Sequence, residues 1–472
     1  MEEAVLPRRR GAWRIWATVR EAVRGSHQDF TEGPIGRAIL LLAIPMVMEM
    51  MMESVFAIAD IFWVSKLGAD SVATVGITES MLALIYAVAI GVSVSATAMV
   101  ARRIGEKDPE HAASAAVQAI ALGVVLAIPI GITGALLAPK LLALMGGSPA
   151  LVATGWRYTA IMLGGNVVIL LLFLVNAIFR GAGDAAIAMR VLWFANILNI
   201  VLGPCFIFGL GPFPKLGVTG AAVATTIGRG CGVLYQLWTL SRGRGRVVIT
   251  RRHLRLEPAV MLRLLRLSGN AIFQILIGTA SWIGLVRILS SFGSAALAGY
   301  TIGIRIIVFA LLPSWGMANA AATMVGQSLG ARKPERAERS VWIAGFYNMI
   351  FLGAVGLAFV LAAPVLIRLF TSDAAVVPFG VACLRFVSYG FLFYAYGMVL
   401  TQAFNGAGDT WTPTWLNLFC FWLWEIPLAY VLAKVVGLGP RGVFIAITIA
   451  FSTLALASAA LFRRGRWKLK KV

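Results

Sequence analysis

Long apolar runs alternate with short polar or Gly/Pro turns along almost the whole chain. A helix needs about 20 apolar residues to cross a bilayer, and twelve runs reach this length. We expect the twelve spans at 38–64, 73–98, 112–138, 154–179, 187–209, 217–240, 264–290, 297–323, 339–365, 378–404, 411–435 and 440–462. The pattern therefore predicts an all-α polytopic membrane protein with 12 transmembrane helices.

The longest polar break, Ser241–Leu267, is basic and divides the spans into six and six. A break of this kind is typical of a linker between two units. We therefore expect a basic N-terminal tail (1–35), an N-lobe (36–240), a linker (241–262), a C-lobe (263–462) and a basic C-terminal tail (463–472).

The two halves are repeats of one another. Met99–Ala112 resembles Met324–Ala337, and FRGAGD at Phe179–Asp184 resembles FNGAGD at Phe404–Asp409, both at an offset of 225 residues. Six spans precede the repeat, so both copies have the same orientation, and the six-helix lobes should be related by a pseudo-two-fold axis along the membrane normal. The aspartates that end the two GAGD turns are expected to cap the following helices.

The first span, 38–64, carries three carboxylates. Glu49, Glu53 and Asp60 fall within about 40° of one another on a helix, so they form one stripe. Each charge costs about 2.5–3.5 kcal/mol at mid-membrane on insertion scales, and such residues usually face a cavity or a partner. Pro45 removes a backbone hydrogen bond below the stripe and is a candidate hinge. We interpret the stripe as an ion or proton site; the alternative is a set of interhelical hydrogen bonds.

Other polar residues inside the spans extend this interpretation. Asn196, Asn199 and Thr225 offer neutral oxygens that suit either an ion site or interhelical hydrogen bonding. Two further carboxylates, Glu79 and Glu425, are candidates for the substrate cavity. The alternatives are a position at the membrane interface for Glu79 and a pairing with Arg287, Arg305 or Arg385 for Glu425. The full set of candidates for the substrate cavity is Glu49, Met50, Glu79, Asn196 and Glu425.

Composition excludes a soluble protein, because 60% of the 472 residues are hydrophobic and the mean hydropathy is +0.86. The formal net charge of +21 invites a nucleic-acid partner. Most Lys and Arg residues, however, lie in the tails, the linker and alternate loops, which is the positive-inside pattern. We therefore expect no nucleic acid, an inner-membrane location with both termini cytoplasmic, and anionic lipid of the cytoplasmic leaflet as a partner.

Cofactor chemistry has little support in the sequence. The four cysteines lie in spans without CxxC spacing, and the three histidines, His27, His111 and His253, lie in cytoplasmic segments. We expect no metal centre, no organic cofactor and no enzyme activity, and we expect a monomer. Residues 12–23 are a candidate helix on the membrane surface.

Several segments resemble multidrug and toxic compound extrusion (MATE) transporters. Residues 43–76 carry Pro45, then Asp60 fifteen residues later, then a Leu-Gly turn. The likeness extends over 33–462 and includes MVARRIGEKD, FRGAGD, LNIVLGPCFIFG, GVTGAAVAT and GLGPRGVFIAI. It implies two six-helix lobes around a central cleft, and export of small molecules driven by entry of H⁺ or Na⁺.

The resemblance is closest to the prokaryotic DinF-like branch, which implies an ion site in the N-lobe. Asp60, Asn199 and Thr225 match the branch pattern and would be the place of a Na⁺ ion. The aspartate expected on the fifth helix falls at Gly203, and Glu53 is a candidate for the displaced second carboxylate. The glutamate that other branches carry on the seventh helix is absent from NAIFQILIGTAS, so no C-lobe ion site is expected.

These features favour a secondary antiporter that exports organic, amphipathic, cationic compounds. A flippase for lipids or lipid-linked saccharides is the alternative, and the acidic first span argues against it. A membrane-embedded enzyme would need a His, Cys or Ser constellation that the chain lacks. A passive channel would be unable to build a substrate gradient.

Overall fold

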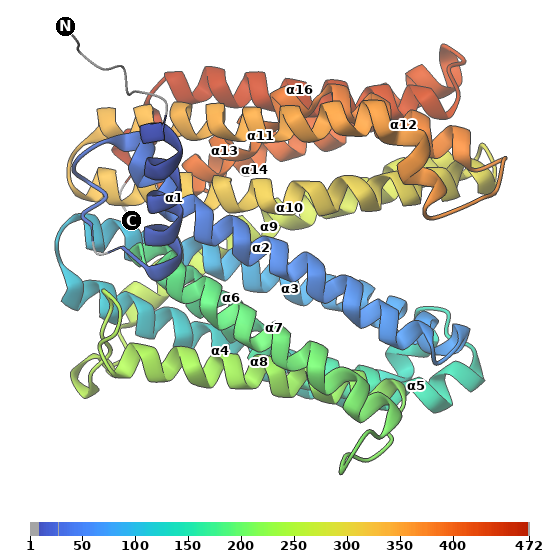
Figure 1. Ribbon diagram of the computed structural model, residues 1–472, viewed down its shortest axis with the longest axis horizontal. Helices are drawn as coiled ribbons and strands as arrows, with labels where there is room; N and C mark the ends of the chain where they lie inside the picture. Colours follow the sequence, from blue (N-terminus) through green and yellow to red (C-terminus); the bar gives the residue numbers. More distant parts are fainter. Residues whose placement is uncertain (1–8, 27, 471–472) are drawn as a thin grey trace, which may run out of the picture.

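The computed structural model describes residues 9–26 and 28–470 and is helical nearly throughout (Figure 1). The first half contains α1 (Arg9–Arg24), α2 (Ile35–Ser65), α3 (Ala69–Gly105), α4 (Pro109–Leu144), α5 (Pro149–Gly164), α6 (Asn166–Ala182), α7 (Ala185–Phe208) and α8 (Val218–Ser241). The second half contains η1 (Arg251–His253), α9 (Pro258–Ser290), α10 (Ser294–Gly330), α11 (Pro334–Arg368), α12 (Val377–Tyr389), α13 (Phe391–Gly406), α14 (Trp411–Asn417), η2 (Leu418–Glu425), α15 (Ile426–Tyr430), η3 (Val431–Val435), α16 (Pro440–Arg463) and η4 (Arg466–Leu469).

Every predicted span coincides with a helix or a run of consecutive helices. Among the described residues, ten helices are long and apolar enough to cross a membrane, and the pair α12 and α13, bent by 60°, makes an eleventh. The remaining predicted span, α8, is outside this set because polar residues such as Arg229 lower its hydropathy. The count of twelve is therefore approximate, although the polytopic helical fold is as predicted.

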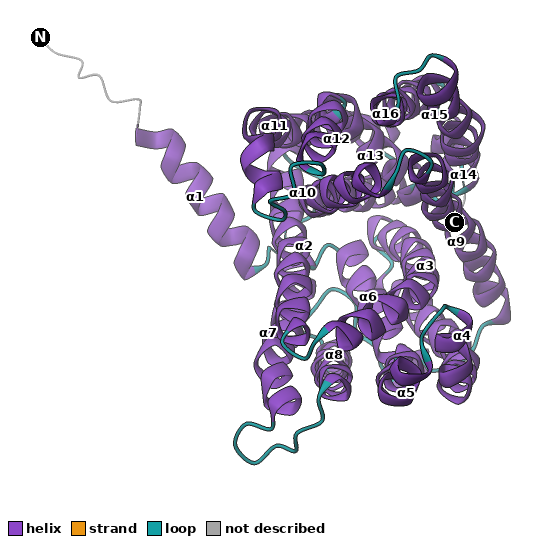
Figure 2. Cartoon of the chain, turned by 90° about the vertical axis from the view of Figure 1, so that its right-hand side faces the viewer, coloured by secondary structure: helices purple, strands orange, loops and turns teal. Residues whose placement is uncertain are grey.

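The helices form two bundles that meet at one end and diverge toward the other (Figure 1). Seen from the diverging end, α2 to α8 make up one bundle and α10 to α16 the other, with α9 at the side between them (Figure 2). The first half of α9 contacts α3, where Ser95 Oγ and Ser268 Oγ are 2.8 Å apart, and its second half accepts a hydrogen bond from Trp422 Nε1 at Ile277 O. We call the two bundles the N-lobe and the C-lobe.

Backbone contact between the lobes defines what we call the closed end. A Cβ atom added to Gly105 would lie 2.0 Å from Gln327 O, and one added to Gly330 would lie 2.1 Å from Arg102 O. Gln327 Nε2 also donates to Gly181 O across the lobes at 2.9 Å. Glycine at these positions therefore lets α3 and α10 touch along their backbones.

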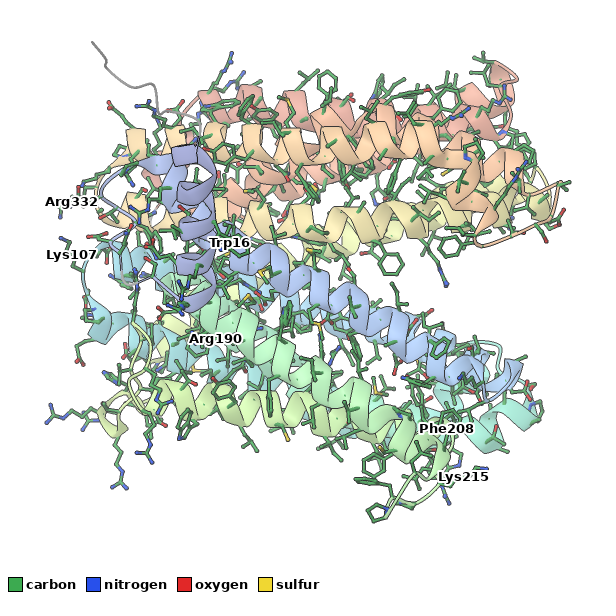
Figure 3. All side chains as sticks on the ribbon, viewed as in Figure 1. Trp16, Lys107, Arg190, Phe208, Lys215 and Arg332 are labelled. Atoms are coloured by element: carbon green, nitrogen blue, oxygen red, sulfur yellow. The ribbon has the colours of Figure 1, made fainter. Side chains whose placement is uncertain are left out.

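The loops at the closed end repeat in detail. Lys107, after α3, and Arg332, after α10, are separated by the same 225 residues as the sequence repeats and both have positive φ, at 60° and 57° (Figure 3). Positive φ is uncommon outside glycine. The shared conformation therefore shows the duplication at the level of the backbone.

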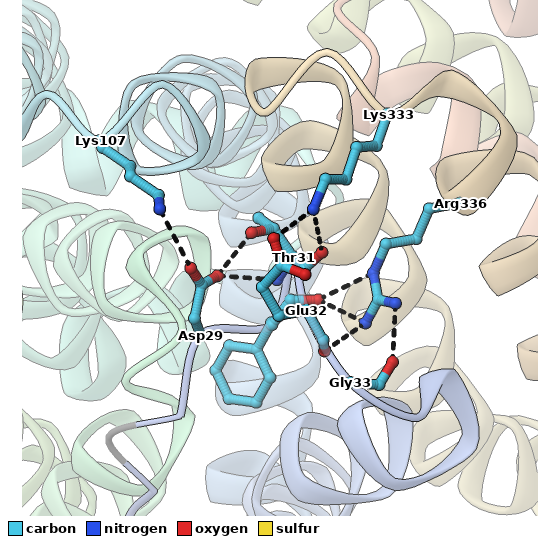
Figure 4. Close-up of polar contacts among 8 residues, drawn as sticks. Asp29, Thr31, Glu32, Gly33, Lys107, Lys333 and Arg336 are labelled. Carbon is cyan, nitrogen blue, oxygen red and sulfur yellow. Dashed lines mark hydrogen bonds and ion pairs between the residues drawn. The ribbon is translucent and has the colours of Figure 1, made fainter.

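Residues 28–33, which we call the strap, cross the closed end between α1 and α2 (Figure 4). On the N-lobe side, Asp29 pairs with Lys107 at 3.9 Å. On the C-lobe side, Glu32 pairs with Lys333, and the Arg336 guanidinium donates to three backbone carbonyl groups of the strap, Phe30 O, Glu32 O and Gly33 O. The strap therefore ties both lobes together at this end.

The aspartates of the two GAGD turns do not cap the next helix as predicted. Asp184 occupies the N-cap position of α7 without forming a side-chain cap hydrogen bond; its carboxylate accepts from the backbone N–H of Arg246. Asp409 precedes the N-cap of α14 and accepts from the side chain of Thr412 in that helix at 2.7 Å; it also pairs with Lys470 at 3.2 Å, and Lys470 O accepts from Arg102 Nη2. Both aspartates therefore fasten other segments at the closed end.

Candidate functional site

Glu49, the first carboxylate of α2, is buried in an ion pair. Only 1% of the residue is exposed, and its Oε1 accepts from Arg180 Nη1 at 2.6 Å and from Asn176 Nδ2 at 3.0 Å. Both partners lie on α6. This pair crosses from α2 to α6 within the N-lobe, so the charge of Glu49 is balanced by a guanidinium.

Glu53 lies one turn further along α2 and is paired in the same way. Its Oε1 accepts from Arg229 Nη2 at 3.3 Å, and its Oε2 accepts from Asn196 Nδ2 at 3.0 Å. Arg229, on α8, is 2% exposed and also donates to Tyr86 Oη at 2.9 Å. Two of the three carboxylates of the stripe are therefore neutralised by arginines from other helices.

Asp60 differs from the other two. Within the described part of the chain, its carboxylate makes no hydrogen bond and no ion pair, although it interacts electrostatically with Glu79 and Arg229. Asn199 and Thr225, which were expected beside it, bond to one another through Asn199 Nδ2 and Thr225 Oγ1 at 2.8 Å. Both are buried. The structure thus brings Asn199 and Thr225 together but leaves Asp60 outside their hydrogen bond.

The arginines Arg180 and Arg229 are the residues that reasoning from the sequence missed. Arg180 falls just after the predicted span 154–179, and Arg229 lies within the predicted span 217–240. Intramembrane basic residues are as unusual as acidic ones and usually pair with them. Applying the same rule to basic residues would have singled out Arg229.

A cavity of about 250 Å³ lies between the lobes. On the N-lobe side its lining includes Met50, Glu53 and Arg180; on the C-lobe side it includes Asn319 and Asn405. We call it the central cavity. Met50, a predicted cavity residue, therefore lines it, whereas Glu49 is not part of its lining.

A second cavity, of about 330 Å³, opens beside the first; because α9 and the C-lobe supply most of its lining, we call it the C-lobe cavity. The two share six lining residues: Ile90, Val94, Leu312, Trp315, Gln402 and Asn405. The remaining lining of this C-lobe cavity is mainly apolar and aromatic, with Trp282, Tyr394 and Phe421 among its residues. A charged compartment and an aromatic compartment therefore adjoin.

Other predicted cavity residues are placed elsewhere. Glu425, at the end of η2, is 2% exposed and lines neither cavity, and none of the proposed arginine partners pairs with it among the described residues. Arg385, for example, donates to Val360 O instead. Glu79 is exposed on α3 and lines neither cavity, while the Asn196 amide is bonded to Glu53. Glu79, Asn196 and Glu425 therefore line neither the central cavity nor the C-lobe cavity.

Pro45, the candidate hinge, is buried inside α2, which runs unbroken from Ile35 to Ser65. The described residues contain no group of three or more His, Cys, Asp or Glu residues that could hold a metal ion. His27 lies outside the described residues.

Comparison with known proteins shows the family to which this chain belongs. Residues 45–205 and 271–431 each match the MatE family. The chain belongs to the MATE family. Its two matches are separated by about the same interval as the internal repeats, so each lobe is one copy of the MatE unit.

Full-length relatives support the same assignment. The chain is 26% identical over 451 residues to "Probable multidrug resistance protein NorM" of Thermotoga maritima, covering 93% of this chain and 94% of that protein. It is 22% identical over 449 residues to "Probable multidrug resistance protein YoeA" of Bacillus subtilis, at 94% and 97% coverage. A solved structure titled "Crystal structure of MATE in complex with MaL6" matches at a TM-score of 0.86 and 30% identity, covering 92% and 97% of the two chains.

As a member of the MATE family, the chain is a membrane-embedded efflux transporter of the multidrug and toxic compound type. The relatives are transporters and not enzymes, which agrees with the prediction from the sequence.

Proposed function

We propose that this MATE transporter is a secondary antiporter that exports organic, amphipathic compounds across the inner membrane while H⁺ or Na⁺ enters through the N-lobe. The central cavity between the lobes is the substrate site, and Asp60 is the principal coupling carboxylate. Asn199 and Thr225 lie on the neighbouring helices and are the neutral oxygens for a Na⁺ ion. The transporter works as a monomer.

The closed end is the cytoplasmic end in this proposal. It carries the described ends of both tails and the basic loops and linker, as the positive-inside pattern requires. Basic residues at this end, including Arg20 and Arg24 of α1, contact anionic lipid of the inner leaflet. The structure is then open toward the outside.

The observation that carries the proposal is the contrast between Asp60 and the other carboxylates of α2. Glu49 and Glu53 each bond to an arginine, whereas Asp60 makes no such bond among the described residues. A carboxylate held by a guanidinium keeps its charge satisfied. A carboxylate without a bonded partner is available to bind and release a cation, and the shared neighbour Arg229 links its state electrostatically to Glu53.

Transport in proteoliposomes with imposed gradients tests the proposal. Substrate accumulation should follow either a pH gradient or a Na⁺ gradient, each imposed alone, and identify the coupling ion. Asp60→Asn keeps the shape but removes the charge and should abolish gradient-driven transport while leaving insertion and substrate binding intact. Accumulation by this variant at the wild-type level would contradict the role of Asp60.

One observation favours flippase activity as a second candidate. The acidic first span disfavours a flippase, but Arg180 and Arg229 pair with two of its carboxylates and bring positive charge to the same region. Guanidinium groups suit phosphate headgroups. Movement of fluorescently labelled lipids between the leaflets of proteoliposomes, dependent on the protein and on a gradient, would support this alternative.

A further inference from the structure

The central cavity exposes one cation and one anion from the same wall. Arg180 and Glu53 both line it. Glu49, the partner of Arg180, and Glu53 are four residues apart on α2, so their side chains are neighbours on the helix surface. The guanidinium of Arg180 and the carboxylate of Glu53 therefore belong to two ion pairs anchored on neighbouring positions of α2, and both line one compartment.

Neither group is saturated by its protein partners. A guanidinium has five N–H donors, and the Arg180 side chain uses one in its bond to Glu49. A carboxylate accepts up to about four hydrogen bonds, and Glu53 receives one from Arg229 and one from Asn196. Each residue can therefore bind a ligand group of opposite charge without losing its partner.

The C-lobe wall contributes polar but uncharged groups. Asn319, Gln402 and Asn405 line the central cavity, and no charged residue from the C-lobe is part of its described lining. Asn405 Oδ1 is buried and has no hydrogen-bond partner among the described residues, and the same holds for Gln274 Oε1 in the adjoining C-lobe cavity. Unpaired buried carbonyl oxygens are costly and indicate that a donor is missing.

We infer that the preferred substrates of this transporter are zwitterionic amphiphiles, rather than simple cations. Their ammonium group binds Glu53 and the amide oxygens of the C-lobe wall, their carboxylate binds Arg180, and their aromatic body occupies the C-lobe cavity beside Trp282 and Tyr394. This inference rests on the proposed function for the location of the substrate site, and it specifies the substrate class.

Charge balance is the physical reason. The four groups Glu49, Arg180, Glu53 and Arg229 sum to zero formal charge. A substrate with a single charge would bring net charge into a site of low dielectric, where an unbalanced charge is expensive. A zwitterion adds two charges that the wall can match one by one, and it leaves the net charge of the cavity unchanged.

A matched series of probes tests the inference by equilibrium binding to the purified full-length protein. Four derivatives of 2-naphthylalanine share one aromatic body: the free zwitterion, the methyl ester as cation, the N-acetyl acid as anion, and the N-acetyl methyl ester as neutral form. The zwitterion should bind about tenfold more tightly than the ester and the N-acetyl acid, as expected for one charge-assisted hydrogen bond. Equal or tighter binding of the ester would overturn the inference, because the site would then select cations.

Two variants separate the two ends of the ligand. Glu53→Gln should erase the preference for the zwitterion over the N-acetyl acid while keeping its preference over the ester. The pair Glu49→Gln with Arg180→Gln should do the reverse; both members are changed because a lone buried Glu49 carboxylate would destabilise the protein. Arg385→Gln, in the C-lobe and away from both cavities, is the matched control and should leave the ranking unchanged.

The test remains decisive if the double variant does not fold. The affinities of the four probes for the wild type and for Glu53→Gln still test both the overall preference for the zwitterion and the contact of its ammonium group. If neither variant alters the ranking, the assigned contacts are wrong. Binding is measured without a gradient, so loss of coupled transport with an intact ranking would reject the proposed antiport and leave the substrate class standing.

Discussion

Gly105→Ala should push the transporter out of its present conformation by a steric effect at the closed end. The new Cβ would lie 2.0 Å from Gln327 O, with the Gln327 carbonyl carbon at 2.7 Å and its Cα at 2.8 Å. These are backbone atoms of the opposite lobe and have no rotamer that avoids the contact. Alanine is a better helix former than glycine, so α3 itself is not weakened, and the whole penalty falls on the contact between the lobes.

The cost follows from the size of the overlap. Overpacking by a methyl group where neighbours are unable to move costs about 1–3 kcal/mol. If all of this is released when the lobes separate at the closed end, the equilibrium shifts by a factor of about 5–150 toward the state open at that end. Gly330→Ala, whose Cβ would lie 2.1 Å from Arg102 O, should act in the same direction.

Distances between spin labels measure this shift directly. Labels on the exposed residues His111 and Glu335, one in each lobe near the closed end, would report the separation in a background without the native cysteines. Gly105→Ala should increase the population at the longer distance. Gly269→Ala is the control, because a Cβ at this position on α9 meets no atom of the other described elements within 4 Å.

An unchanged distance distribution in folded Gly105→Ala protein would refute the steric reasoning. It would mean that α3 and α10 have room to separate without opening. An equal response of Gly269→Ala would point to a general effect of alanine on helix stability instead of contact between the lobes.

Three further predictions concern α2 and the strap. Pro45→Ala restores a backbone hydrogen bond in α2 and should slow turnover under a fixed gradient more than it weakens substrate binding; equal turnover would argue against a hinge. Glu53→Gln leaves Arg229 without its carboxylate partner, so the charge of Arg229 acts on Asp60 alone and coupled export should fall nearly as far as on loss of Asp60. Adding Gly203→Asp supplies a second carboxylate and should recover part of the export, since among the described residues a Cβ at Gly203 meets only Trp63, at 3.9 Å. Normal export by Glu53→Gln across the pH range would contradict this indirect role of Glu53 in coupling. The hydrogen bond from Lys333 lowers the pKa of the Glu32 carboxyl below its ordinary value of 4.5, so this pair stays charged above that pH and is lost only as pH falls through the lowered value. Lys333→Gln should therefore favour opening of the closed end by the same small factor at pH 5.5 and at pH 8, as measured with the same spin labels. A factor that changed between these two pH values would show that the Glu32–Lys333 pair does not stay charged over this range.

The architecture was largely readable from the sequence. Length and apolarity place the spans, because a helix in a bilayer must satisfy its backbone internally over a fixed thickness. The repeat of 225 residues revealed the duplication, which the matching positive φ of Lys107 and Arg332 shows again in the backbone. The predicted span that is not apolar enough to count among the membrane-crossing helices, α8, carries the buried Arg229.

The charge of the site, in contrast, depends on the tertiary structure. The sequence determined that α2 presents Glu49, Glu53 and Asp60 on one face, since their spacing fixes this. It did not determine their partners, because Arg180 and Arg229 lie 131 and 176 residues away along the chain and reach α2 only when the N-lobe is packed. The acidic stripe predicted from one helix is therefore a set of balanced ion pairs in the fold, and within it only Asp60 has no bonded partner among the described residues. The reason is that electrostatic neighbours in a helical bundle are set by packing between helices and not by proximity along the sequence.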